Sequence, residues 1–125
     1  MYLCQWWELA NDKIKNIDTP LLHVEEAETS LALAIGERVL MDKAVEEAFD
    51  RRATLKERGF FASEFVKYDA RHKGPYINPP MDMIHDISTS GVVGDASKAT
   101  IEEGRDILNS TVERLVMFCK QLKRK

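Results

Sequence analysis

Long apolar runs and cysteine clusters are both missing from this 125-residue chain. No apolar run approaches the roughly 18 residues of a membrane-spanning helix, which argues against a membrane protein. Met1 is followed by YLCQWWEL, without the basic segment that opens a secretory signal peptide. The two cysteines, Cys4 and Cys119, form no CxxC zinc pattern and lie in apolar surroundings, so we expect buried thiols. These absences favour a cytoplasmic protein.

A strong charge of one sign is missing too. The net charge is −3, which argues weakly against nucleic acid as a partner. The one basic cluster is the tail, with Lys120, Lys123, Arg124 and Lys125. Cations there complement the dipole of a helix end, and an anion-binding tail is the alternative. With 44% hydrophobic and 31% charged residues, the sequence predicts one soluble globular domain over residues 1–125.

The chain opens on Tyr2–Trp6, a short apolar run typical of a strand. Because nothing precedes it to pair with, we expect a partner to supply the neighbouring strands. The next segment, Trp7–Lys15, predicts a helix with Trp7, Ala10 and Ile14 on one face. The following residues break it, because the residue before Pro20 is disfavoured in a helix.

Further helices are predicted downstream. Glu25–Ile35 has helical spacing of its apolar residues and is interrupted by Gly36. Met41–Glu57 predicts a charged helix that turns Val45, Ala48 and Phe49 inward. The irregular stretch 59–86 has room for short strands at 60–68 and 83–87.

The last helix is the clearest element. Thr100 and Glu103 form a T-x-x-E capping box. The residues that follow place one apolar stripe along the helix, which predicts core packing: Ile101, Ile107, Leu108, Val112, Leu115, Val116, Cys119 and Leu122.

Two segments could carry chemistry. In HVEEAETS, His23 and Glu28 stand together at a helix start, where the helix dipole alone also favours carboxylates. In TSGVVGD, Gly91 and Gly94 could let backbone amides approach an anion, or could simply occupy a turn that needs positive φ. His72 and His85 have no acidic or cysteine neighbour at ligand spacing, so we interpret them as surface or hydrogen-bonded residues.

Taken in order, these pieces resemble the second half of the creatininase family. The order is a strand ending in WWEL, then HVEEAETSL, then ERVLMDKA, and finally SGVVGDASKATIEEGR. The family often reads H-A-G-x-x-E-T-S, then a P-E-L-V-x-M-D-like run, then s-G-v-x-G-D-P-x-x-A-T-x-x-x-G. Here Val24-Glu25 replaces Ala-Gly, and Ala96 replaces Pro. The Val24-Glu25 pair is bulkier than Ala-Gly and carries a charge, so it would reshape the pocket beside His23.

The resemblance implies an α/β fold of three layers, αβα, of which this chain supplies the C-terminal half. Family members are roughly twice as long, as one large domain can be. Their first half carries most metal ligands, in E-x-H and G-H motifs and an Asp. We therefore expect an N-terminal-half creatininase-like chain as partner, in a hexamer-like assembly. A processed fragment, or a non-catalytic structural or regulatory subunit, is the alternative.

The resemblance also implies a mechanism. Family members hydrolyse C–N bonds of small cyclic amides or formamides with divalent Zn, Mn or Fe, which activates a water molecule. By position, His23 matches the catalytic histidine, which would donate a proton to the leaving nitrogen or polarise the carbonyl. Glu28 would complete or orient the metal shell. The candidate substrate contacts are Trp6, Trp7 and Glu25.

Overall fold

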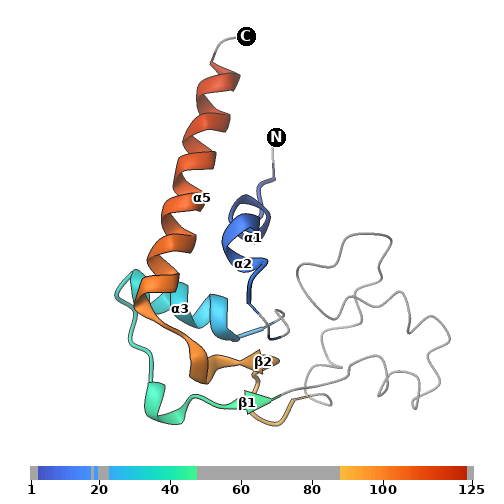
Figure 1. The fold of residues 1–125 in the computed structure, drawn as a ribbon, viewed down its shortest axis with the longest axis vertical. Helices are drawn as coiled ribbons and strands as arrows, with labels where there is room; N and C mark the ends of the chain where they lie inside the picture. Colours follow the sequence, from blue (N-terminus) through green and yellow to red (C-terminus); the bar gives the residue numbers. More distant parts are fainter. Residues whose placement is uncertain (1–2, 18, 20–22, 48–87, 124–125) are drawn as a thin grey trace, which may run out of the picture.

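The computed structural model describes residues 3–17, 19, 23–47 and 88–123. In these ranges a long C-terminal helix stands beside shorter helices, with a small two-stranded sheet near its N-terminal end (Figure 1). The elements in chain order are α1 (Trp6–Leu9), α2 (Asn11–Ile14), α3 (Glu26–Ala34), η1 (Met41–Lys43), β1 (Glu46–Glu47), β2 (Gly94–Asp95), η4 (Ala96–Lys98) and α5 (Ile101–Leu122).

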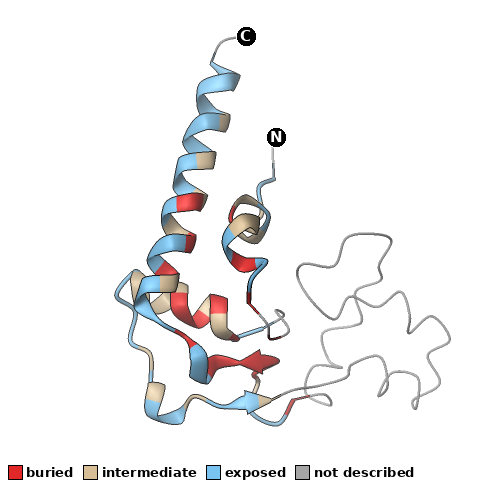
Figure 2. Ribbon diagram, viewed as in Figure 1, coloured by how far each residue is buried: buried red, intermediate tan, exposed pale blue. Residues whose placement is uncertain are grey.

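The core lies where α2, α3 and the first half of α5 meet. Buried residues gather there and along β2, while the far half of α5 is exposed or half-buried (Figure 2). The core residues are Ala10, Ile14, Ile17, Ala27 and Ile107, with Trp6, Trp7 and Leu31 packed against them. The predicted face with Trp7, Ala10 and Ile14 is therefore confirmed, although a turn at Ala10 divides the helix into α1 and α2.

Helix α3 confirms the helix predicted over residues 25–35. Glu25 is its N-cap, and its carboxylate accepts hydrogen bonds from the first turn. At the other end, Gly36 N–H donates to Leu33 O and Glu37 N–H donates to Ala32 O. This pair of bonds is a Schellman motif, and Gly36 has the positive φ of 83° that the motif requires.

Helix α5 begins after Thr100, as the capping box of Thr100 and Glu103 predicts, but a third side chain takes part in the cap. Thr100 Oγ1 accepts a hydrogen bond from Glu103 N at 3.1 Å. The carboxylate of Glu103 does not close the box on Thr100 directly. Instead, Ser30 Oγ donates to Glu103 Oε2 and accepts from Thr100 N, each at 2.9 Å. The cap of α5 is thus completed by a side chain from α3.

The two helices cross closely at Gly104. A Cβ atom added there would stand 1.9 Å from the carbonyl oxygen of Ser30. Only a residue without a side chain fits this crossing. Farther along, the inward face of α5 is polar: Ser110 Oγ donates to Asp12, which pairs with Arg114 at 2.7 Å.

Two predicted elements are wrong in the described residues. Leu3–Gln5 form no strand, and α1 begins at Trp6, because a helix lets Trp6 and Trp7 pack on the core near Ala10. The predicted helix from Met41 gives only the short η1, after which the chain extends into β1. Strand pairing overrides helical propensity there, since Glu46 and Glu47 pair antiparallel with β2.

The remaining parts of these predictions lie outside the described residues: Tyr2, the predicted helix from Ala48 onward with Phe49, the stretch 59–86 with its short strands, His72 and His85. Val45, predicted to point inward, is 38% exposed. In place of core packing, its carbonyl accepts a hydrogen bond from Ala96 N.

The predicted core stripe of α5 is also wrong for most of its length. Of the eight stripe residues, Ile107 is buried and Leu108 is half-buried. The other six are exposed: Ile101, Val112, Leu115, Val116, Cys119 and Leu122. The physical reason is the helical angle. The face that packs inward carries Gly104, Ile107, Ser110 and Arg114, and the apolar stripe lies about a third of a turn away from it.

The two thiols are free, as expected, but the prediction that they are buried is wrong. Cys4 precedes α1, Cys119 lies on the open stripe of α5, and both are exposed. As for membrane spans, the described helices include none with the length and apolar character to cross a bilayer.

Candidate functional site

His23 lies where the two motif segments meet. Its backbone forms an isolated antiparallel bridge with Val93, whose N–H donates to His23 O at 2.9 Å. Val93 belongs to the segment SGVVGD and is buried, whereas His23 is exposed. The bridge fixes the backbone of His23 and leaves the residue exposed to solvent.

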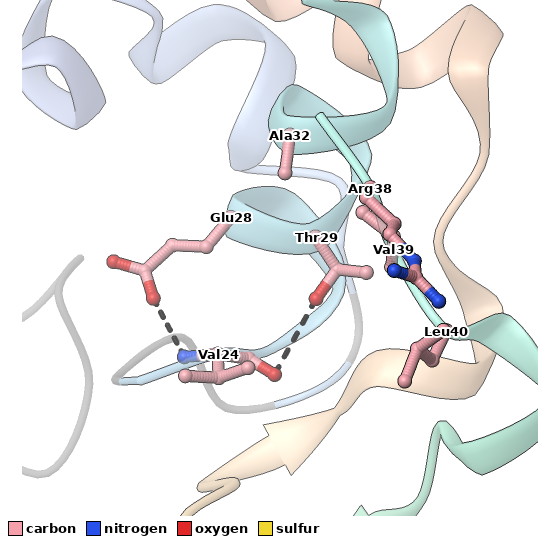
Figure 3. A pocket seen from close by; sticks show the side chains of 7 residues that line it. All are labelled: Val24, Glu28, Thr29, Ala32, Arg38, Val39 and Leu40. Carbon is pink, nitrogen blue, oxygen red and sulfur yellow. Dashed lines mark hydrogen bonds between the residues drawn. The ribbon is translucent and has the colours of Figure 1, made fainter. Parts of the chain in front are cut away.

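Val24 links His23 to α3 in a strained conformation. Its φ is +49°, a region that β-branched residues rarely adopt. Two side chains of α3 hold it: Glu28 Oε2 accepts from Val24 N at 2.6 Å, and Thr29 Oγ1 donates to Val24 O at 3.5 Å (Figure 3). Glu28 and Thr29 therefore position the residue that follows His23.

Glu25 is the buried carboxylate of the motif, at 2% exposure. Its two carboxylate oxygens accept from Ala27 N at 2.9 Å and from Glu28 N at 3.1 Å. Burial raises the pKa of Glu25 to about 7, against the opposing effect of these two hydrogen bonds; the negative charges of Glu28 and Glu26 add to the rise. Glu25 thus caps α3 and titrates near neutral pH.

A pocket of about 380 Å³ opens between the first half of α3 and the segment that follows it. Its walls are mostly apolar, with opposite charges on two sides: Figure 3 shows Glu28 and Arg38 across the pocket from each other, with Thr29 between them. The described lining residues are Val24, Glu28, Thr29, Ala32, Arg38, Val39 and Leu40.

The predicted site residues are only partly brought together here. Glu28 lines the pocket, and His23 adjoins it through Val24. Trp6 and Trp7 instead pack against the core, edge to face with ring centroids 5.8 Å apart. Within the described lining, neither tryptophan nor Glu25 appears, so their role as substrate contacts stays a prediction.

Sequence reasoning missed Arg38. It stands in ERVLMDKA, a segment that the sequence analysis used only to support the family resemblance. The available signal was a single cation followed by the apolar pair Val39-Leu40, two residues after the glycine that ends a helix. Only the chain reversal at Gly36 brings this cation beside α3.

In the TSGVVGD loop, the turn interpretation of the glycines is confirmed. Gly91 and Gly94 have φ of 85° and 139°, as a turn requires. The loop also holds an anion, the carboxylate of Glu47, which accepts from Thr89 N at 2.8 Å, Ser90 N at 3.1 Å and the Ser90 hydroxyl. Hydrogen bonds from Ser90 and Thr89 hold the pKa of Glu47 at about 2.

The described residues by themselves do not fit a divalent metal. Nowhere among them do three or more His, Cys, Asp or Glu side chains gather as a ligand set. Both oxygens of Glu25 and one oxygen of Glu28 already accept backbone N–H groups. Among the described residues, the motif therefore offers an exposed histidine at position 23 and a Glu28 carboxylate that holds the backbone of Val24.

Comparison with known proteins decides the family. The sequence profile of creatininase, described as creatinine amidohydrolase, matches residues 1–119 of the 125. The chain belongs to the creatininase family. No curated protein and no solved structure gives a significant match.

Membership of the creatininase family confirms the resemblance found in the sequence. It implies an α/β fold, and the described residues show helices with a small sheet. It also places the chain among the amidohydrolases, in a family that is generally metal-dependent. Its matched range contains His23, Glu28 and Arg38, so the pocket lies within the family region.

Proposed function

We propose that this chain forms the C-terminal half of a metal-dependent amidohydrolase that cleaves a C–N bond in a small cyclic amide or formamide. The observation that carries the proposal is the creatininase match over residues 1–119. The complete domain would have three layers, αβα, to which this chain contributes α3, α5 and a part of the sheet. Within this proposal, His23 and Glu28 belong to the active site, because they stand at the matching positions of the family's H-A-G-x-x-E-T-S motif.

His23 is the proposed general acid. The residue is exposed, and its backbone is held by the bridge to Val93. In the reaction it would donate a proton to the leaving nitrogen as the C–N bond breaks, or polarise the carbonyl before attack. Glu28 supports this role because its carboxylate fixes the N–H of Val24, the next residue.

The other half of the site would come from an N-terminal-half creatininase-like chain, in a hexamer-like assembly. We propose that this half brings most ligands of a Zn, Mn or Fe ion, with Glu28 completing or orienting that shell. The exposed stripe on α5 supports a partner. Val112, Leu115 and Val116, spaced i, i+3 and i+4 on one face, are 49%, 40% and 45% exposed, and contiguous apolar surface of this kind marks interaction sites.

Co-purification followed by mass and metal analysis tests the partnership. The chain is captured under native conditions, and its partners are identified by mass spectrometry. We expect a creatininase-like protein carrying E-x-H and G-H motifs, together with a stoichiometric divalent metal. The isolated chain should bind zinc or manganese only weakly.

Two results would overturn this account. Tight, stoichiometric zinc or manganese binding by the isolated chain would contradict the need for a second half. A stable homo-oligomer that contains no metal and hydrolyses no amide would favour the non-catalytic subunit instead.

A further inference from the structure

Arg38 stands at one side of the pocket as an exposed cation. In the part of the chain that the structure describes, the ion pairs are Lys98 with Asp95 and Arg114 with Asp12, and Arg38 takes part in neither. Its guanidinium lies beside the apolar side chains of Val39 and Leu40 (Figure 3). A guanidinium presents a planar set of N–H donors that matches a carboxylate or a phosphate.

We infer that this pocket selects an amide substrate that carries an anionic group, and that Arg38 binds this group. The inference rests on the proposed amidohydrolase function and names its substrate class. The apolar walls, Val24, Ala32, Val39 and Leu40, would contact the hydrocarbon body between the anionic group and the amide. A volume of about 380 Å³ is within the range of small-molecule sites.

The two charges also set the orientation of the ligand. Glu28 lies across the pocket from Arg38 and repels an anion, so the anionic group binds at the Arg38 side. The amide end is then directed toward Glu28 and Val24. Val24 directly follows His23, the proposed general acid, in the chain.

Binding of three matched amides to the full-length chain tests the inference without any turnover. The probes are 4-acetamidobutanoate, its neutral methyl ester, and 2-acetamidoethyl phosphate, each titrated by calorimetry. We expect at least one of the two anionic probes to bind about tenfold more tightly than the ester, as a charge-assisted hydrogen-bond pair provides. The tighter of the two anions identifies whether the group is a carboxylate or a phosphate.

Variants assign the effect to one side chain. Arg38→Gln should bind the anionic probe about tenfold more weakly and the ester unchanged, while Arg38→Lys keeps part of the preference. Arg105→Gln removes an exposed arginine on α5 and should bind as the unmodified chain does. Circular dichroism confirms that each variant is folded.

Three results would overturn the inference: no saturable binding of any probe, equal affinity for the ester and the anions, or unchanged anion binding by Arg38→Gln. None of them bears on whether the assembled enzyme hydrolyses amides, since turnover is not measured. Loss of hydrolysis in the assembly, with anion binding intact, would instead count against the proposed function alone.

Discussion

Ser30 Oγ donates a hydrogen bond to Glu103 Oε2 at 2.9 Å, across 73 residues of sequence. Ser30 ends the segment HVEEAETS, and Glu103 belongs to the segment that begins at Ser90. The two family motifs therefore meet in space, at the crossing of α3 and α5. Ser30 of the first motif and Gly104 of the second both serve this helix crossing.

Removing the Ser30 hydroxyl should destabilise the fold. Ser30 is fully buried, and it serves both Glu103 and the N–H of Thr100. Ser30→Ala leaves these groups without their partner, which costs about 1–3 kcal/mol of unfolding free energy. Urea unfolding measures the change. Thr111→Ala is the control, since its hydroxyl bonds only to Ile107 O in its own helix, and an equal loss in both variants would refute the bridging role.

An alanine at position 104 should destabilise the chain although alanine favours helices. In an open helix, Gly→Ala stabilises by about 1 kcal/mol. At Gly104 the new Cβ would meet backbone, at 1.9 Å from the oxygen and 2.4 Å from the carbonyl carbon of Ser30, so α3 and α5 must separate. We expect a loss of about 1–3 kcal/mol, as in other overpacked sites.

Thermal unfolding followed by circular dichroism checks this expectation. Asn109→Ala, at an exposed position of the same helix, is the matched control and should raise the melting temperature slightly. A Gly104→Ala variant as stable as the original chain would show that the two helices do not cross this closely.

Glu25 should make stability depend on pH. Its pKa is about 7 in the folded chain, above the ordinary value of 4.5. The folded state therefore holds the proton more tightly, and the stabilisation that Glu25 contributes is fully present below pH 4.5 and is lost as pH rises toward 7. The decline attributable to this group is about 3 kcal/mol at most.

Comparing urea midpoints at several pH values isolates the contribution of Glu25. Glu25→Gln cannot ionise, so its stability should fall less than that of the original chain between pH 4.5 and 7. Glu102→Gln, an exposed carboxylate on α5, is the control and should leave the slope unchanged. Identical slopes for Glu25→Gln and the original chain would mean that Glu25 ionises normally.

The parts of the fold that local chemistry determines were predictable. The T-x-x-E pattern locates the start of α5, and Gly36 locates the end of α3. Long-range pairing was not predictable. The pattern over Met41–Glu57 predicts a helix, but Glu46 and Glu47 pair with Asp95 and Gly94, which lie far along the chain. Hydrophobic periodicity located an apolar stripe on α5, yet it gave no information on which face the neighbouring helices cover.

The candidate site was predictable where a motif carries it. His23 and Glu28 were found from HVEEAETS, and the structure shows that Glu28 holds the residue beside His23. Arg38 was missed because its position in the pocket depends on the turn after α3. This turn brings Arg38, Val39 and Leu40 next to Glu28 and Thr29. The roles of Trp6 and Trp7 remain predictions, since both rings pack against the described core.

The most direct test of the proposed function is the turnover number of the complete assembly. His23, an exposed residue, is the proposed general acid of the hydrolysis, so its loss should slow the reaction. His23→Ala should reduce kcat for hydrolysis of the amide substrate by about 100-fold or more, as loss of a general acid does. The mutant should still assemble with its partner, since the bridge to Val93 uses only the backbone of His23. An unchanged kcat in a correctly assembled mutant would remove His23 from the mechanism.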